Sequence, residues 1–157
     1  MNTEHFEFIV DNMLKGLAKW LRFLGFFSIT VENIHNARDY LQQHPSSIFL
    51  TSSSDHLGQL ENYQGFLVKG KKISDQLQEL NREFHIFEKI NLFSICSLCN
   101  VALEPISIEA VIDKVPEGVR KKVKKFQFCP HCQRVYWQGG HITRLLNKIK
   151  RMGIISP

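Results

Sequence analysis

The fold is indicated first by residues 6–25, FEFIVDNMLKGLAKWLRFLG, where the apolar pattern changes from that of a strand to that of a helix. Residues 6–10 predict a short strand, which Asp11 and Asn12 end. The apolar residues that follow recur at helical spacing, which predicts an amphipathic helix that ends at Gly25. A strand followed directly by a helix is the first half of a βαβ unit.

The same alternation continues to about residue 90. Strands that alternate with helices build a mostly parallel sheet, and near-continuous apolar strands fit a sheet that is covered on both faces. We therefore expect an α/β fold with three layers and a boundary near residues 91–94. The further predicted strands are 28–31, 48–51 and 65–68, and the further predicted helices are 36–44, 55–61 and 73–84.

The composition excludes several classes of protein. Of the 157 residues, 43% are hydrophobic and 22% are charged, values that are ordinary for a soluble globular protein. The longest mostly apolar run, residues 23–31, is far shorter than the roughly 20 residues of a membrane-spanning helix. The polar, acidic start argues against a secretory signal and an oxidising compartment. We expect a soluble protein of the cytoplasm, and the sequence does not predict its oligomeric state.

The positive charge is concentrated in the second part of the chain. Residues 1–95 carry 9 Lys and Arg against 11 Asp and Glu, a net charge of −2, whereas residues 96–157 carry 11 against 4, a net charge of +7. A basic region attracts polyanions, and nucleic acid is the commonest of these inside a cell. The alternative is a solvated basic face that only keeps the protein soluble.

All four cysteines lie in two Cys-x-x-Cys pairs, Cys96 with Cys99 and Cys129 with Cys132, which are separated by 29 residues. Two such pairs supply the four sulfur ligands of a structural zinc ion, and the long spacer requires a longer hairpin or an inserted helix. Two disulfides and a redox dithiol are the less favoured alternatives. His131 lies between the last two cysteines and is an alternative ligand to one of them.

Basic and aromatic side chains that suit RNA surround the cysteines and line one side of the first helix. Lys and Arg neutralise phosphates, and aromatic rings stack on unpaired bases, although the aromatics of a small ribbon often form its core. The C-terminal segment, with Arg144, Lys148, Lys150 and Arg151, predicts a basic amphipathic helix. The candidate RNA-binding residues are Lys15, Lys19, Arg22, Arg120, Lys121, Lys122, Lys124, Lys125, Arg134, Tyr136 and Trp137.

Three acidic residues follow the first three predicted strands: Asp11, Glu32 and Asp55. Ligands bind beyond the carboxyl ends of parallel strands, and oxygen ligands there suit Mg²⁺ or Mn²⁺, which can activate water for phosphodiester cleavage. Each residue also has a structural interpretation. Asp11 and Asp55 are each in a position to cap the helix that follows. Glu32 is interpreted as a side chain that only contacts solvent. The other histidines, including His56, follow no ligand spacing and are interpreted as surface or core residues.

Nearly the whole chain resembles the Mut-seven carboxy-terminal RNase domain family, in which a PIN-like nuclease domain is fused to a zinc ribbon. The resemblance lies in residues 8–25, FIVDNMLKGLAKWLRFLG, and in residues 93–100, FSICSLCN, followed by Leu-Glu-Pro at 103–105. It continues in residues 129–141, CPHCQRVYWQGGH. The resemblance implies a PIN-like α/β domain over residues 1–92 and a zinc ribbon with a basic C-terminal helix over residues 93–157. It also adds His141 to the candidate RNA-binding residues.

The resemblance further implies a metal-dependent ribonuclease whose acidic residues hold the catalytic ion. Asp11 matches the family's first acidic position. The sequence departs from the family at Phe27, near a second acidic position, and at residues 51–55, TSSSD, where the family tends to have Thr-Arg-Asp.

Three functional hypotheses follow. The first is a Mg²⁺- or Mn²⁺-dependent ribonuclease with structural zinc, acting on RNA, with transfer RNA and ribosomal RNA as candidates. The second is a degenerate nuclease that serves as an RNA- or ribosome-binding module. The third makes the ribbon a protein-interaction module and the charge a solubility device.

Overall fold

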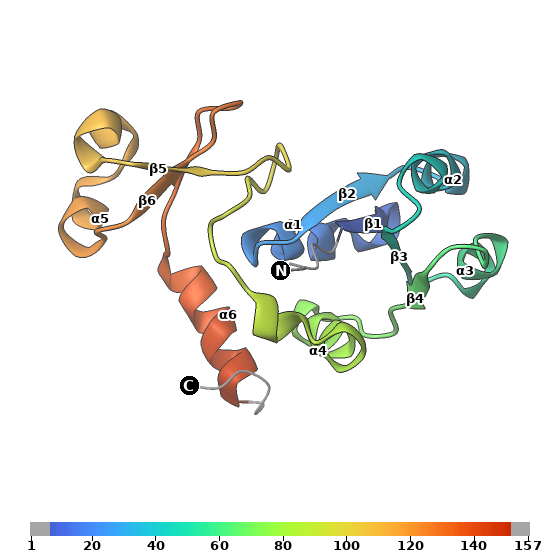
Figure 1. Ribbon diagram of the computed structural model, residues 1–157. Helices are drawn as coiled ribbons and strands as arrows, with labels where there is room; N and C mark the ends of the chain where they lie inside the picture. The colour runs from blue at the N-terminus through green and yellow to red at the C-terminus, as the bar shows by residue number, and fades with distance from the viewer. Residues whose placement is uncertain (1–6, 152–157) are drawn as a thin grey trace.

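Four parallel strands form a sheet in the computed structural model, which describes residues 7–151 except the side chains of residues 141, 142, 145 and 149 (Figure 1). The strand order is β2-β1-β3-β4. Because every pair is parallel, the carboxyl ends of all four strands lie at one edge of the sheet, the carboxyl edge. The strands are β1 (Glu7–Asp11), β2 (Phe27–Val31), β3 (Ile48–Thr51) and β4 (Gly65–Leu67).

The two central strands, β1 and β3, are buried on both faces, since successive side chains of a strand point to opposite sides. Phe8 packs on the face that is covered by α1 (Lys15–Phe23) and α4 (Ile73–Phe84). Ile9 packs on the other face, which is covered by α2 (Ile34–Gln43). The sheet therefore lies between two layers of helices, as the near-continuous apolar strands predict.

Two helices begin at side-chain caps that shift them from their predicted starts. The side chain of Asn33 accepts a hydrogen bond from the backbone N–H of Asn36, so that α2 begins two residues earlier than predicted. Ser53 caps α3 (Ser54–Gln59) in the same way by accepting from the N–H of His56. The interpretation of Asp55 as the cap is therefore wrong, and Asp55 lies in the first turn of α3.

The first predicted helix begins as a 3₁₀ turn, η1 (Asn12–Leu14), and continues as α1. Asp11 caps this turn, because its carboxylate accepts a hydrogen bond of 3.0 Å from the backbone N–H of Asn12. Gly25 follows the end of α1 with φ of 99°, where a Cβ atom would lie 2.4 Å from the carbonyl oxygen of Asn91. Glycine is thus required both by its positive φ and by the close approach of the segment that leads to the cysteines.

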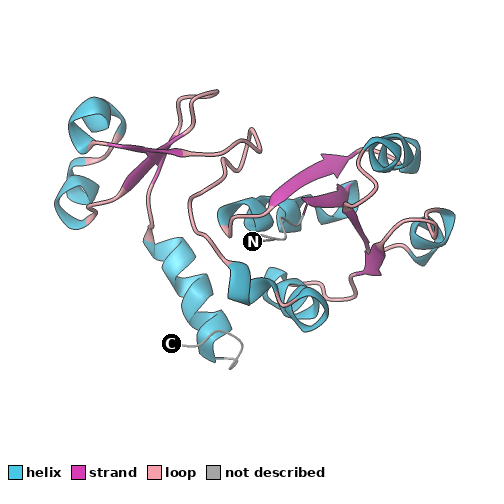
Figure 2. Ribbon diagram, viewed as in Figure 1, coloured by secondary structure: helices cyan, strands magenta, loops and turns pink. Residues whose placement is uncertain are grey.

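A separate antiparallel sheet with the order β5-β6-β7 follows that segment, and we call residues 93–137 the ribbon (Figure 2). The long spacer between the cysteine pairs contains two helical segments. Of the two predicted ways to accommodate its length, the structure therefore has inserted helices. The last helix returns to the first part of the molecule, where Leu146 joins the core formed by α1 and α4. The remaining elements are η2 (Ile86–Lys89), β5 (Glu104–Ile106), η3 (Ile108–Lys114), α5 (Glu117–Lys122), β6 (Phe126–Phe128), β7 (Val135–Tyr136) and α6 (Gly140–Arg151).

The predicted fold class is confirmed: a mostly parallel α/β sheet is flanked by helices and followed by a small unit with a four-cysteine cluster. Within residues 7–151, no helix is long and apolar enough to cross a membrane.

Candidate metal centre and carboxyl edge

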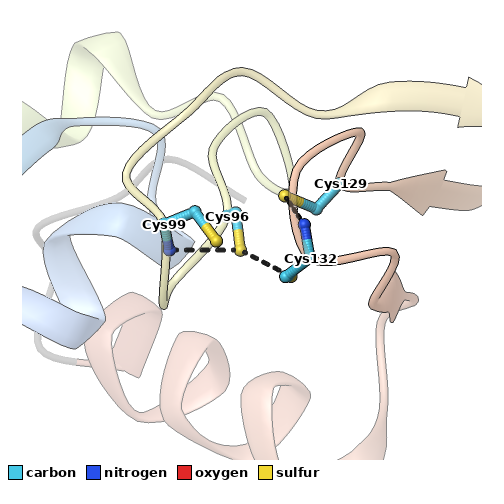
Figure 3. A group of neighbouring side chains, drawn as sticks. All are labelled: Cys96, Cys99, Cys129 and Cys132. Carbon is cyan, nitrogen blue, oxygen red and sulfur yellow. Dashed lines mark hydrogen bonds between the residues drawn. The ribbon is translucent and has the colours of Figure 1, made fainter.

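The four cysteine side chains converge from two turns that are far apart in the sequence (Figure 3). Cys96 and Cys99 belong to the turn before β5, and Cys129 and Cys132 to the turn between β6 and β7. All four Sγ atoms lie within 4.8 Å of one another, and those of Cys96 and Cys132 are 3.7 Å apart. Zn–S bonds of about 2.3 Å in a tetrahedron place the sulfurs about 3.8 Å apart, whereas a disulfide requires about 2.05 Å. The four free thiols fit zinc and exclude the two-disulfide alternative in this structure.

The two turns, which we call the cysteine turns, have the same backbone geometry. In each, the residue after the second cysteine donates its N–H to the carbonyl of the first cysteine, at 3.0 Å for Asn100 and 2.8 Å for Gln133. Both of these residues have positive φ, 56° and 63°. The N–H of the second cysteine in each turn also points to the Sγ of the first at 3.4 Å. N–H groups directed at sulfur stabilise thiolates, the form that binds a metal.

Tyr136, the last residue of β7, supports the first cysteine turn. It is buried, and its hydroxyl lies 3.1 Å from the Sγ of Cys96 and 3.2 Å from the backbone N of Ser97, which donates to it. Burial raises the pKa of the Cys96 thiol, but the hydrogen bonds from Tyr136 and the backbone outweigh burial and lower that pKa to about 7. The predicted role of Tyr136 in base stacking is not supported by this buried position.

We expect Tyr136→Phe to lower zinc affinity by about 10- to 100-fold, because groups that hydrogen-bond metal ligands typically contribute this much. The aromatic ring and its edge contact with Phe23 remain, so the fold of the ribbon is retained. Competition with a zinc-binding dye measures the affinity. An unchanged affinity would show that the hydroxyl serves only the backbone of Ser97.

At the carboxyl edge of the parallel sheet, Asp11 ends β1 and is 3% exposed. One oxygen of its carboxylate, Oδ2, accepts a hydrogen bond of 2.7 Å from the hydroxyl of Thr51, the last residue of β3. The same oxygen lies 2.6 Å from Nδ1 of His56 on α3. Hydrogen bonds from two neighbouring elements therefore fix this carboxylate. The contact with His56 was not predicted, because its sequence position indicated only a surface or core residue.

The other two predicted acids are placed differently. Asp55 is exposed and accepts a hydrogen bond from Gln59 at 2.9 Å, and Glu32 is exposed after β2. Among the described residues, the four cysteines are the only group of three or more Cys, His, Asp and Glu side chains close enough to hold one metal ion. The structure therefore brings Asp11 together with Thr51 and His56, and leaves Asp55 and Glu32 apart.

A lysine-rich loop that the sequence reasoning did not select also lies at the carboxyl edge. Val68, just after β4, donates its N–H to the carbonyl of Thr51, and residues 69–72, KGKK, follow it directly. Three lysines immediately after a predicted strand are the sequence signal that would have identified this loop. The N-terminal ends of α1 and α4 are close there, since a Cβ at Gly16 would lie 3.7 Å from Ile73. The loop therefore brings three exposed lysines to the end of the sheet where α1 begins, and the carboxylate of Glu79 accepts hydrogen bonds from the N–H groups of Lys69 and Gly70.

The predicted RNA-binding residues divide into exposed side chains and side chains held by the protein. Arg120 donates to the carbonyls of Val115 and Ile112, and Trp137 is half-buried against Phe126. The side chain of His141 lies outside the described part of the chain. The exposed residues are Lys15, Lys19, Lys121, Lys122, Lys124, Lys125 and Arg134.

Arg22 joins α1 to the ribbon. Its Nε donates to the carbonyl of Ser28 and its guanidinium NH1 to the carbonyl of Ser97, both at 2.6 Å. Burial lowers the pKa of this guanidinium, and the nearby Cys96 and Cys99 oppose that effect. Both donors are thus directed at the protein rather than at solvent.

We expect Arg22→Ala to lower the free energy of unfolding by about 2 kcal/mol, because two charge-assisted hydrogen bonds are lost and two carbonyls are left without these donors. Denaturant unfolding measures the change. Arg82→Ala, an exposed arginine on α4, is the matched control and should change stability by less than about 0.5 kcal/mol. Equal effects of the two substitutions would contradict the assignment of Arg22 as the link to the ribbon.

A parallel α/β domain with a fixed aspartate at its carboxyl edge, joined to a four-cysteine ribbon, defines the class of this protein. The family model described as the Mut7-C RNAse domain matches residues 6–149, and the chain belongs to this family. This membership indicates a nuclease-like role and RNA as the general substrate class. Comparisons with curated proteins and with solved structures gave no match.

Proposed function

We propose that this protein is a metal-dependent ribonuclease that cleaves RNA at the carboxyl edge, with the ribbon supplying the basic surface that binds the RNA. The position of Asp11 carries the proposal. It is a buried carboxylate at the end of a central strand, and Thr51 and His56 fix its orientation. Membership of an RNase domain family supports RNA as the substrate, with transfer RNA and ribosomal RNA as the candidates to test first.

The donor groups at this edge fit Mg²⁺ or Mn²⁺ at the lower limit of what such ions require. Mg²⁺ is commonly held by only one or two carboxylates together with phosphate groups of the substrate. Asp11 is the first of these carboxylates. Asp55 and Glu32 are the proposed additional acids, although their side chains lie apart from Asp11 in this structure. When bound, such an ion activates water and stabilises the charge that develops on the phosphate. The protein's part is to hold the carboxylate of Asp11 in one orientation before the RNA arrives.

Positive charge near Asp11 supports the binding of RNA at this edge. Lys15 follows η1 directly, and residues 69–72 contribute three further lysines at the end of β4. The exposed lysines of α5 and the segment after it extend the basic surface over the ribbon. Phosphate contacts of this kind give affinity that falls steeply with salt.

The test is cleavage of labelled single-stranded and structured RNA by the zinc-loaded protein, with Mn²⁺, with Mg²⁺ and with no added divalent ion. A chelator is avoided because it would also remove zinc from the cysteines. We expect cleavage only when Mn²⁺ or Mg²⁺ is added. Cleavage of equal rate without either ion would contradict a metal-dependent mechanism.

The second candidate is an RNA- or ribosome-binding protein without nuclease activity. It is favoured by two observations: Asp55 and Glu32 lie apart from Asp11, and both oxygens of Asp11 already have protein partners. RNA binding with no cleavage under every metal condition would favour this candidate over the ribonuclease.

Both candidates require the basic surface of the ribbon. We expect replacement of Lys121, Lys122, Lys124 and Lys125 by glutamine to weaken RNA binding and to reduce the slope of log affinity against log salt by up to about 3, since each phosphate contact on a single strand contributes about 0.7. Affinity measured from low to high salt provides the slope. An unchanged slope would place the RNA elsewhere, and failure to bind RNA at low salt would favour a protein-interaction role for the ribbon.

A further inference from the structure

A small, shallow cavity that is open to solvent lies between α1, the first cysteine turn and β7. Its volume is about 220 Å³, below the roughly 300–1,000 Å³ of sites for drug-sized ligands. It therefore suits a group of the size of a single nucleobase. Side chains from α1, the segment before the first cysteine turn, that turn, and β7 with its two flanking residues line it, among them Lys19, Phe23, Phe93, Leu98, Arg134 and Trp137.

The lining combines aromatic rings with positive charge. Phe23, Phe93 and Trp137 are only partly buried although each packs against a core cluster, and the ring of Trp137 is supported by Phe126 at a centroid distance of 6.2 Å. Arg134 is exposed, and Lys19 is exposed with its Nζ over the Phe23 ring, 5.9 Å from the ring centroid, which leaves Phe93 and Trp137 as the rings for stacking. No acidic side chain among the described residues lines the cavity. Aromatic faces bind unpaired bases by stacking, while the cations pair with phosphates.

Leu98 is a further lining residue of this cavity, at an exposed position. Its side chain is 54% exposed at the tip of the first cysteine turn, and it lines the cavity. A large exposed apolar side chain beside exposed cations has no role in the core. Together with Phe23, Phe93 and Trp137 it forms an apolar patch that is suited to the face of a planar ring.

The walls of the cavity are fixed to one another before any ligand binds. Arg22 joins α1 to the carbonyl of Ser97, and Asn100 accepts a hydrogen bond of 2.9 Å from the N–H of Ser28. The N–H of Phe93 also bonds to the carbonyl of Phe23. A preformed site avoids part of the entropy cost of ordering its walls on binding.

We propose that this cavity binds one unpaired base of single-stranded RNA, with Lys19 and Arg134 contacting the adjacent phosphates. The proposal rests on the proposed RNA function and specifies which feature of the RNA the protein recognises. Lys15 lies one helical turn before Lys19, towards Asp11, and the span of α1 from Lys15 to Phe23 is about 12 Å. The cavity therefore selects RNA that is unpaired a short distance from the bond at the carboxyl edge.

The experiment compares three probes that bind the zinc-loaded Asp11→Asn protein without added Mg²⁺ or Mn²⁺, so that no probe is cleaved. The probes are a short oligouridylate, a ribose-phosphate oligomer of equal length without bases, and a duplex RNA. Base stacking on aromatic side chains predicts that the oligouridylate binds about 5- to 150-fold more tightly than the abasic oligomer. Quenching of tryptophan fluorescence by the oligouridylate alone provides a second readout.

The decisive variant is Leu98→Asp, which places a carboxylate at the cavity. Its matched control is Ile112→Asp, which adds the same charge at another exposed apolar side chain, 44% exposed. We expect Leu98→Asp to bring the ratio of the affinities for the oligouridylate and the abasic oligomer close to one. Ile112→Asp should leave this ratio unchanged. Equal binding of the two oligomers by the unmodified cavity, or a preference that survives Leu98→Asp, would overturn the cavity proposal while leaving RNA binding intact. Failure of every RNA probe to bind would instead reject the proposed function as well.

Discussion

Removal of zinc is expected to unfold the ribbon while the parallel sheet stays folded. The strands of the ribbon are only two or three residues long, and a sheet of this size is marginal without further support. The ribbon has two small clusters of buried side chains. In the first, two of the three members are the zinc-ligand candidates Cys96 and Cys129, and the third is Tyr136; the second consists of Val111, Val115 and Phe126. Zinc binding by small zinc-finger peptides contributes about 10–16 kcal/mol. We therefore expect a bound zinc ion to supply a large part of the stability of residues 93–137.

The measurement is amide hydrogen exchange on the protein with zinc and after dialysis against a chelator. We expect the amides of the ribbon to lose protection, whereas the central strands β1 and β3, which are buried on both faces, retain it. Cys129→Ser should produce the same pattern and should abolish the single zinc ion per chain.

His131→Ala is the control for the ligand set. His131 is not among the side chains whose ligand atoms all lie within 4.8 Å of one another, although its Nδ1 lies 3.4 Å from the Sγ of Cys99, and four sulfurs already complete a tetrahedron. We expect His131→Ala to retain one zinc ion per chain. Loss of zinc from this variant would show that the histidine replaces one of the cysteines.

The parallel sheet could be predicted from the sequence because its signals are local. Runs such as 48–51 have the same bounds in the structure as in the prediction, and the helix at 73–84 does as well. The period of the apolar residues and the turn residues between the runs depend only on neighbours in the chain. The spacing of the cysteines was equally informative, since a Cys-x-x-Cys turn presents both sulfurs to one ion by itself.

The composition of the site at the carboxyl edge could not be predicted in the same way. Asp55 and His56 are adjacent, but α3 begins at the Ser53 cap, and successive helical residues differ in direction by about 100°. This geometry directs His56 at Asp11 and leaves Asp55 in contact with Gln59. The direction of each side chain therefore depends on where α3 begins and on how it packs. Neither can be inferred from the position of a residue after a predicted strand.

Arg22 shows the same limit on the other side of the molecule. The spacing of Lys15, Lys19 and Arg22 predicts one exposed basic stripe, and the two lysines are exposed. Arg22 lies where the ribbon meets α1, so its charge is used to bind two backbone carbonyls. No local pattern indicates that a segment 75 residues later covers this position.

Substitution of Asp11 by asparagine is expected to reduce RNA cleavage by at least about 100-fold while changing RNA affinity by less than about twofold. The negative charge that would hold the ion is lost, and removal of a single group that stabilises charge in the transition state commonly costs about 10²–10³ in rate. Affinity should be retained because the proposed RNA contacts are the exposed lysines of the ribbon and of residues 69–72, whereas Asp11 is a buried carboxylate.

The same substitution should leave the fold intact, which makes the loss of activity interpretable. Asparagine has the shape of aspartate. With its amide nitrogen in the place of Oδ2 it can donate to the Nδ1 of His56 or to the hydroxyl of Thr51, and its oxygen in the place of Oδ1 can still accept from the N–H of Asn12. We expect the free energy of unfolding to change by about 1 kcal/mol or less. Unfolding and cleavage are therefore measured on the same preparation.

Two further substitutions separate the role of the acidic group from a general effect of charge. Asp55→Asn removes an exposed carboxylate of the proposed ion site and should reduce cleavage by less than Asp11→Asn, because Asp55 is not fixed by neighbouring elements. Glu83→Gln removes an exposed carboxylate on α4, outside the proposed site, and should leave cleavage unchanged. Cleavage that survives Asp11→Asn at the original rate would exclude this aspartate from catalysis, and equal losses in all three variants would indicate that net charge, not the carboxyl edge, controls the reaction.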